Sequence, residues 1–331
     1  MIWSGYGHYL EKTARNGGSH QRDPEIIISN IVLIGQIPAP TLHESARTEV
    51  FWNACLTPRQ ITARWLISTS PPASSGAART GPGHRFVVAH LDTFMGAEID
   101  HNYVIAKNTI TGPGILDNSL SVGVLASLPV ICRHLNLKFE SDIVLAAVPQ
   151  SIGKGNLQGI KHLIDTWDGP IRGAVIMEGE KLGRLSYYSE GIIRGEIVCN
   201  VTATNGWEHR YKPNAIIILN KVIDEILAME LPQRPLSRII IGKIQGGFKH
   251  GVIAYDARLG FEIQSDSEEM VRRMHSELKD IVSGIGHENH VSLKLNIISN
   301  LTPAKLSYRH PLVKSTVVIM RTLGLKPITD S

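Results

Sequence analysis

Residues 86–93 read Phe-Val-Val-Ala-His-Leu-Asp-Thr, and residues 112–118 read Gly-Pro-Gly-Ile-Leu-Asp-Asn. The apolar, β-branched start of the first stretch predicts a buried strand. His90 and Asp92 stand two apart at its exit, so both side chains are expected on the same face. Asp117 follows a Gly/Pro turn and precedes an apolar helical run, at the kind of place where open α/β sheets bind ligands. The pattern fits a metal-binding histidine held by a carboxylate, and it equally fits a core histidine beside a helix-capping aspartate.

The composition is that of a globular protein large enough for two ordinary domains, with 331 residues, 43% of them hydrophobic and 19% charged. The net charge is only +4 and the basic residues are scattered, so no nucleic-acid partner is expected. Cys55, Cys132 and Cys199 lack Cys-x-x-Cys spacing, which favours reduced thiols in a cytoplasmic protein. Residues 1–18 have no apolar signal core, and no run approaches the roughly 18 apolar residues of a membrane span. No membrane association is therefore expected.

The first half of the chain alternates between strand and helix patterns, which predicts an α/β fold with a mainly parallel sheet. A Ser-, Pro- and Gly-rich loop is expected over residues 69–84. The expected helices lie at residues 23–34, 42–56, 119–135 and 157–166. The expected strands lie at residues 61–67, 86–89, 142–148 and 174–177.

The second half has the order β-α-β-β-α-β, which predicts a ferredoxin-like α+β domain inserted into the first. The domains are therefore expected at residues 1–190 plus 300–331 and at residues 191–299. Four strands are expected, at residues 194–203, 239–245, 252–264 and 291–299. Three helices are expected, at residues 213–229, 267–283 and 311–323.

This order and several short motifs resemble the di-zinc exopeptidase family of aminoacylases, tripeptide aminopeptidases and glutamate carboxypeptidases. The resemblance covers residues 37–331. The matching pieces are Ile-Pro-Ala-Pro-Thr at 37–41, the stretches 89–93 and 112–118, Gly-Asn-Leu-Gln-Gly at 155–159, Lys-Pro-Asn-Ala at 212–215, His-Pro-Leu-Val at 310–313 and Leu-Gly-Leu at 323–325.

The resemblance implies a role for four residues. His90 matches the histidine that binds one zinc, and Asp92 matches the carboxylate that orients it. Asp117 matches the acid that bridges both zincs, and the family often has a cis peptide directly after it, here Asp117-Asn118. Glu178, after an apolar strand, matches the acid that completes the first zinc site. One histidine and two carboxylates are a suitable zinc ligand set with room for water.

Other positions depart from the family pattern. Gln150 stands at the position of the general base, and an amide cannot take a proton from water. Ser151 stands where the family has a ligand of the second zinc. The family's C-terminal histidine ligand has no counterpart before Ser331, so one zinc is expected and the C-terminal part of the first domain is expected to be short.

Substrate-binding positions are altered as well. Asn205 aligns with a histidine that reaches a partner's active site, and Gly251 and Gln264 align with the residues that grip the substrate carboxylate. The glycines of residues 153–159 are off by one from a dinucleotide-binding loop, so a helix-leading turn is favoured there.

Two functions follow as hypotheses. The first is a zinc metallopeptidase or amidohydrolase that acts on small peptides or N-acyl amino acids, impaired in this chain. The alternative is a catalytically inactive homologue with a binding or dimer-scaffold role, since fold alone does not decide function. The family also implies a homodimer formed through the inserted lid or dimerisation domain. A third reading is a chain shortened relative to a working parent.

Overall fold

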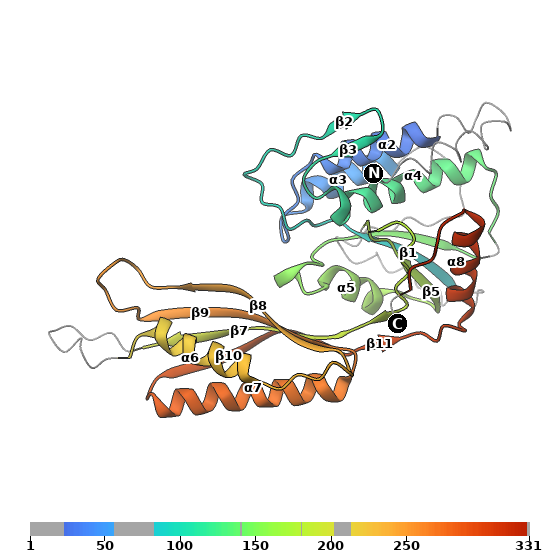
Figure 1. The fold of residues 1–331 in the computed structure, drawn as a ribbon. Coiled ribbons are helices and arrows are strands. Elements are labelled where there is room, and N and C mark those ends of the chain that lie inside the picture. The colour runs from blue at the N-terminus through green and yellow to red at the C-terminus, as the bar shows by residue number, and fades with distance from the viewer. Residues whose placement is uncertain (1–22, 56–82, 140, 180, 202–212, 330–331) are drawn as a thin grey trace. The chain divides into compact units, whose positions relative to one another are not determined.

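The structure is a computed structural model that describes residues 23–55, 83–139, 141–179, 181–201 and 213–329 (Figure 1). The chain divides into two compact units, Met1–Arg184 and Leu185–Ser331. The expectation that residues 300–331 complete the first domain stays a prediction.

The first unit is built on a parallel sheet of the order β4-β1-β5. Strand β1 (His84–His90) is central, flanked by β4 (Ile143–Val148) and β5 (Ile171–Ile176). Both faces of β1 are apolar, as is usual for parallel strands covered on both sides. The expected α/β class with a parallel sheet is therefore confirmed.

Helices cover both faces of this sheet (Figure 1). On one face, α2 (Asp23–Gly35), α3 (Ser45–Cys55) and α4 (Leu120–His134) enclose one apolar cluster. On the other, α5 (Gln158–Thr166) closes a second. The first cluster consists of Ile34, Phe51, Cys55, Ala89, Leu91, Val122, Leu125, Ala126, Leu145 and Ala147.

The elements of this unit lie close to their expected places, with local differences. Helix α3 begins at Ser45 rather than 42, because Leu42 has a left-handed φ of 79° and its N–H is bonded to the side chain of Glu44. An exposed hairpin of β2 (Val104–Ala106) and β3 (Thr109–Thr111) was not expected. The strand expected at 61–67, and nearly all of the loop at 69–84, lie outside the described residues.

The helical stretch Ile115–His134 differs from the expectation that no run approaches membrane-spanning length. It is long and apolar enough by length and composition, with a mean hydropathy of 1.6. Half of that window is buried inside the protein, and the apolar face of α4 lies in the cluster it shares with α2 and α3. Core packing therefore accounts for its composition.

The second unit contains an antiparallel sheet of the order β10-β7-β9-β8. Its elements run as β7 (Gly191–Asn200), α6 (Ala215–Ala228), β8 (Ser237–Gly246), β9 (Asp256–Ser265), α7 (Glu268–Glu288) and β10 (Ser292–Leu301). Both helices and one sheet face share a single apolar cluster, since alternate residues of β7 are buried. Side-chain caps start the helices: Asn214 accepts from Ile216 N–H at α6, and Ser267 accepts from Met270 N–H at α7.

Two short strands and a helix complete this unit. Strand β6 (Tyr188–Ser189) pairs with β11 (Ala304–Lys305), so the segments before β7 and after β10 lie side by side. Helix α8 (Pro311–Thr322) follows, with proline in its first turn and His310 as its cap.

Candidate metal centre

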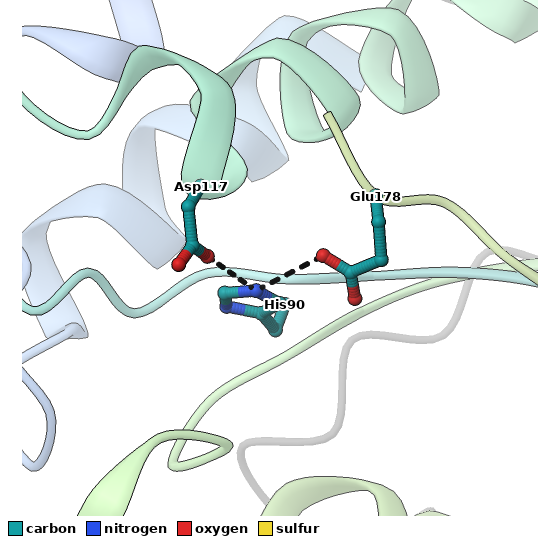
Figure 2. Close-up of side chains that lie close together, drawn as sticks. All are labelled: His90, Asp117 and Glu178. Carbon is teal, nitrogen blue, oxygen red and sulfur yellow. Dashed lines mark ion pairs between the residues drawn. The ribbon is translucent and has the colours of Figure 1, made fainter. Parts of the chain in front are cut away.

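His90, Asp117 and Glu178 converge at the carboxyl ends of the parallel strands (Figure 2). His90 is the last residue of β1, and Glu178 follows the end of β5. The Nε2 atom of His90 lies 3.0 Å from Oδ1 of Asp117 and 3.5 Å from Oε2 of Glu178. The three donor atoms lie within 4.8 Å of one another, so one cation could contact all of them.

Local contacts hold the two acidic segments together. The peptide bond Asp117-Asn118 is cis, as the family resemblance implied. The Asn118 amide donates a 2.9 Å hydrogen bond to the carbonyl of Met177, the residue before Glu178. A Cβ on Gly179 would lie 2.2 Å from the carbonyl oxygen of Leu116, so only glycine permits this close approach.

Both ring nitrogens of His90 lie beside hydrogen-bond acceptors. Its Nδ1 atom lies 2.9 Å from the Asp92 carbonyl oxygen, which can only accept, so Nδ1 carries a proton and donates. Nε2 then faces the carboxylates of Asp117 and Glu178, and a lone pair there would be repelled. Either a second proton or a metal cation satisfies this arrangement.

The pKa of His90 reflects the same geometry. Burial alone would lower it, but hydrogen bonds with Asp117, Asp92 and Glu178 outweigh burial and raise the pKa to about 11. A metal ion would therefore have to displace the proton from Nε2. One imidazole and two carboxylates are ligands that zinc accepts, and a backbone carbonyl on the other ring nitrogen is the usual support for such a histidine. The residues present therefore fit a metal ion.

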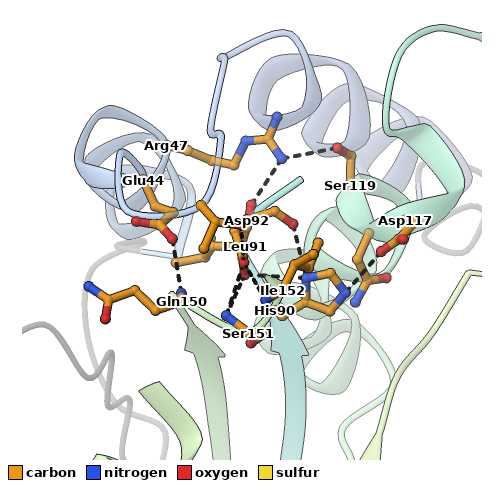
Figure 3. Close-up of polar contacts among 12 residues, drawn as sticks. Glu44, Arg47, His90, Leu91, Asp92, Asp117, Ser119, Gln150, Ser151 and Ile152 are labelled. Atoms are coloured by element: carbon orange, nitrogen blue, oxygen red, sulfur yellow. Dashed lines mark hydrogen bonds and ion pairs between the residues drawn. The ribbon is translucent and has the colours of Figure 1, made fainter. Parts of the chain in front are cut away.

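Asp92 is completely buried, and its carboxylate organises the neighbouring loop (Figure 3). It accepts hydrogen bonds from the backbone N–H of Ser151 and Ile152 and from the hydroxyl of Thr41, at 2.8–3.0 Å. Burial would raise the pKa of Asp92, but bonds from His90 and from these backbone groups hold it below its usual range. The carboxylate lies 3.5 Å from His90 Nδ1, farther away than the backbone carbonyl of the same residue.

Gln150 and Ser151 contribute to the loop through their backbone rather than to the group of three ligands. The Gln150 N–H donates to Oε1 of Glu44 at 2.9 Å. Figure 3 shows the Gln150 side chain extending on the Glu44 side, away from His90. There it lines an open pocket of about 530 Å³ together with Glu44, which precedes α3, and with residues of α3 and α5, including His162. The side-chain amide of Gln150 therefore lies away from His90 (Figure 3).

The predicted substrate-binding positions fall in the second unit. Gly251 is exposed in the β8–β9 connection with a φ of 77°. Gln264 lies in β9, where its side chain is hydrogen-bonded to Arg238 and Glu262. Asn205 lies outside the described residues.

Sequence reasoning missed Arg47 on α3 and Glu44 directly before this helix. Arg47 is fully buried and hydrogen-bonded to the carbonyl of Leu91, between His90 and Asp92. Its position four residues before Phe51 puts it on the apolar stripe of the helix. A charged residue on such a stripe is the signal that could have revealed it.

Comparison with known proteins supports the fold. No family model and no curated protein matches the chain. The di-peptidase Dug1p of Saccharomyces cerevisiae superposes with a TM-score of 0.68 at 11% identity, over 99% of this chain and 87% of its own. The aminopeptidase PepT of Bacillus cereus gives 0.63 at 14%, over 93% and 84%.

A third structure, the YXEP protein of Bacillus subtilis, is described as a dinuclear metal binding peptidase from the M20 family. It gives a TM-score of 0.56 at 9% identity, over 94% of this chain and 83% of its own. Such low identities show the fold alone. The resemblance to di-zinc exopeptidases is therefore confirmed at the level of the fold, which this chain shares with these peptidases.

Proposed function

We propose that this chain is a zinc metallopeptidase or amidohydrolase that acts on small peptides or N-acyl amino acids, with weak catalysis. The observation that carries the proposal is the convergence of His90, Asp117 and Glu178 at the strand ends, in a fold shared with a di-peptidase and a dinuclear metal binding peptidase. A cytoplasmic location, without nucleic-acid or membrane partners, belongs to the same proposal.

The protein's own residues define what chemistry remains. A bound zinc ion would supply Lewis acidity toward a substrate carbonyl and would acidify a water molecule. Neutral His90 offers Nε2 while its Nδ1–H donates to the Asp92 carbonyl. Asp117 and Glu178 balance the charge of the cation. Gln150 stands where the family has a general base, and an amide cannot take a proton from water. A general base typically contributes 10²–10⁴-fold to such reactions, so turnover is expected to be low.

Hydrolysis of a panel of di- and tripeptides and N-acyl amino acids with added zinc tests this function. Three proteins are compared: the unmodified chain, His90→Ala, and the double variant Gln150→Glu, Ser151→Glu. Weak turnover that His90→Ala removes and the double variant raises would support the proposal. Robust turnover of the unmodified chain would contradict the conclusion that Gln150 leaves the reaction without a general base. Turnover unaffected by His90→Ala would contradict the assignment of the metal site.

The alternative is an inactive homologue with a binding or dimer-scaffold role, and the second unit offers the observation that favours it. Strand β8 is an edge of its sheet with ten residues. Ile240 and Ile244 on it are 42% and 54% exposed, and Phe248 just beyond is 89% exposed. Exposed apolar edge strands tend to pair with another chain. We therefore propose a homodimer that joins along β8.

The mass in solution tests this dimer. The unmodified chain should have a dimer mass in light scattering, and Ile244→Lys should shift it to monomer. The same change at the exposed Leu227 on α6, Leu227→Lys, serves as the control and should leave the mass unchanged. A monomeric unmodified chain would contradict the dimer.

We also propose that residues 191–299 are a ferredoxin-like insert in a domain formed by residues 1–190 and 300–331. The β6–β11 pairing supports this, because the chain leaves and re-enters at neighbouring strands. The strand order with two helices on one face is consistent with it. Deletion of residues 191–299 with a short linker should leave a folded protein, and an unfolded product would contradict the proposal.

A further inference from the structure

Arg47 lies completely buried in α3 and is hydrogen-bonded to three segments of the first unit, and Figure 3 shows its contacts with two of them, at Leu91 and Ser119. Its Nη2 donates to the carbonyls of Gly35 at 3.0 Å and Ile37 at 2.5 Å, and its Nε also donates to Ile37, at 2.8 Å. Gly35 ends α2, so these bonds satisfy carbonyls at the C-terminus of a helix, where a cation is favoured.

The third guanidinium nitrogen reaches the two segments that bear the candidate metal ligands. Nη1 donates to the Leu91 carbonyl at 3.1 Å and to the Ser119 hydroxyl at 3.2 Å. Leu91 stands next to His90, and Ser119 stands two residues after Asp117. A single nitrogen atom therefore spans the end of β1 and the turn that leads into α4.

Burying the charged guanidinium of Arg47 costs free energy that an apolar side chain of similar size would not cost. Burial lowers the pKa of Arg47 to about 10, although nearby Tyr103 and Asp92 raise it. Its described hydrogen-bond partners are neutral carbonyls and a hydroxyl rather than a carboxylate. An apolar side chain in its place would avoid this cost, but it would leave the buried carbonyls of Gly35 and Leu91 without these donors. We therefore attribute the role of Arg47 to the groups that its hydrogen-bond donors hold in place.

We propose that Arg47 is a positioning residue that sets the spacing between His90 and Asp117, and thereby the affinity of the metal centre. This inference rests on the proposed metal site. The guanidinium is a rigid planar fork with five donors, whereas the lysine ammonium is a point charge with three, so lysine cannot reproduce all of the contacts.

The experiment compares Arg47→Lys, Arg47→Met and Ser119→Ala with a control, Leu125→Ala. Ser119→Ala removes one link and keeps the charge, so it remains informative if Arg47→Met does not fold. Leu125 is fully buried in the apolar cluster that α2, α3 and α4 enclose, and its side chain forms no hydrogen bonds. Its truncation therefore weakens the core and leaves the hydrogen bonds of Arg47 in place. Two readouts are used on the full chain: amide hydrogen exchange without metal, and zinc affinity by calorimetry.

Without metal, exchange in residues 90–93 and 115–119 should rise about tenfold more than in the rest of the first unit in Arg47→Lys and Ser119→Ala, while Leu125→Ala raises it evenly. Zinc affinity should fall by about 10–100-fold in Arg47→Lys and stay near that of the unmodified chain in Leu125→Ala. If exchange in residues 90–93 and 115–119 rises no more than in the rest of the first unit in every variant, the inference is overturned. If exchange responds as expected but the unmodified chain binds no zinc, positioning stands and the proposed metal site fails.

Discussion

His90 Nε2 lies 3.0 Å from Oδ1 of Asp117, in a contact where two acceptors would meet unless a proton or a cation lay between them. We expect one tightly bound zinc per chain after dialysis against zinc-containing buffer and then zinc-free buffer. His90→Ala should abolish binding, because the other two ligands are half-exposed carboxylates. His162→Ala, at the pocket lined by Gln150, is the control and should retain the zinc. Two zincs per chain by elemental analysis would contradict a single site.

Asp92 is expected to be the residue of this centre most important for stability. Asp92→Ala leaves the N–H groups of Ser151 and Ile152 without their partner, so the free energy of unfolding should fall by about 3 kcal/mol or more. Urea unfolding measures the change. Asp165→Ala, at an exposed position on α5, should change it by less than about 0.5 kcal/mol. Equal effects would show that the loop does not depend on Asp92.

Two glycines in helices should respond to alanine in opposite directions. A Cβ on Gly123 of α4 would lie 2.6 Å from the Cα of Ile31, in backbone that cannot move aside easily, so Gly123→Ala should destabilise by about 1–3 kcal/mol. Gly284 in α7 is exposed with nothing within 4 Å, so Gly284→Ala should stabilise by about 1 kcal/mol. Thermal unfolding of both variants checks the pair, and a stabilising Gly123→Ala would contradict the close packing of α2 on α4.

The buried cysteines should resist alkylation in the folded protein. Burial raises the pKa of Cys55 to about 12 and that of Cys199 to about 11. The thiolate is the reactive form, so at pH 8 its fraction is about 10⁻⁴ for a pKa of 12. At pH 8, iodoacetamide should label the half-buried Cys132 faster than the buried Cys55, as mass spectrometry of the treated protein would show. Rapid labelling of Cys55 would mean that α3 opens readily.

The raised pKa values of Cys55 and Cys199 also determine how the free energy of unfolding changes with pH. A thiol whose pKa is raised by folding favours the native state below its unfolded pKa of about 8.5. Its contribution to the free energy of unfolding is lost as the pH rises through the folded pKa. Unfolding measured at pH 7.5 and pH 10 should therefore show lower stability at the higher pH, with a smaller difference in Cys55→Ala.

Local patterns predicted the strand that ends in His90, because an apolar β-branched run and a following polar pair are visible within a few residues. Glu178 was found in the same way, after a second such run. Their convergence with Asp117 depended on both strands being parallel, which the alternation of helices and strands indicated. These site assignments remain predictions of function, although the geometry brings the three residues together.

What local patterns could not predict are the contacts between segments far apart in the chain. The position of Arg47 on the apolar stripe of α3 signals burial, but its partners Gly35, Leu91 and Ser119 are set only when α3 packs on α2 and α4. The left-handed conformation of Leu42 depends on the Glu44 carboxylate, which also binds the distant N–H of Gln150. The stretch Ile115–His134 includes polar residues and so has no unbroken apolar run of about 18 residues, whereas its mean hydropathy of 1.6 is high enough for a membrane span.

The loop at Gln150 and Ser151 is held by backbone N–H groups that donate to Glu44 and Asp92, and every amino acid except proline has such a group. These backbone bonds do not depend on the side chain of Ser151, whereas the left-handed φ of 56° at Gln150 disfavours β-branched and bulky residues there. A lineage could exchange a pair of acids there for an amide and a hydroxyl in single steps that keep these backbone hydrogen bonds and yet change the chemistry. By the same reasoning, the way back to an acidic pair stays open without any need to rebuild the scaffold.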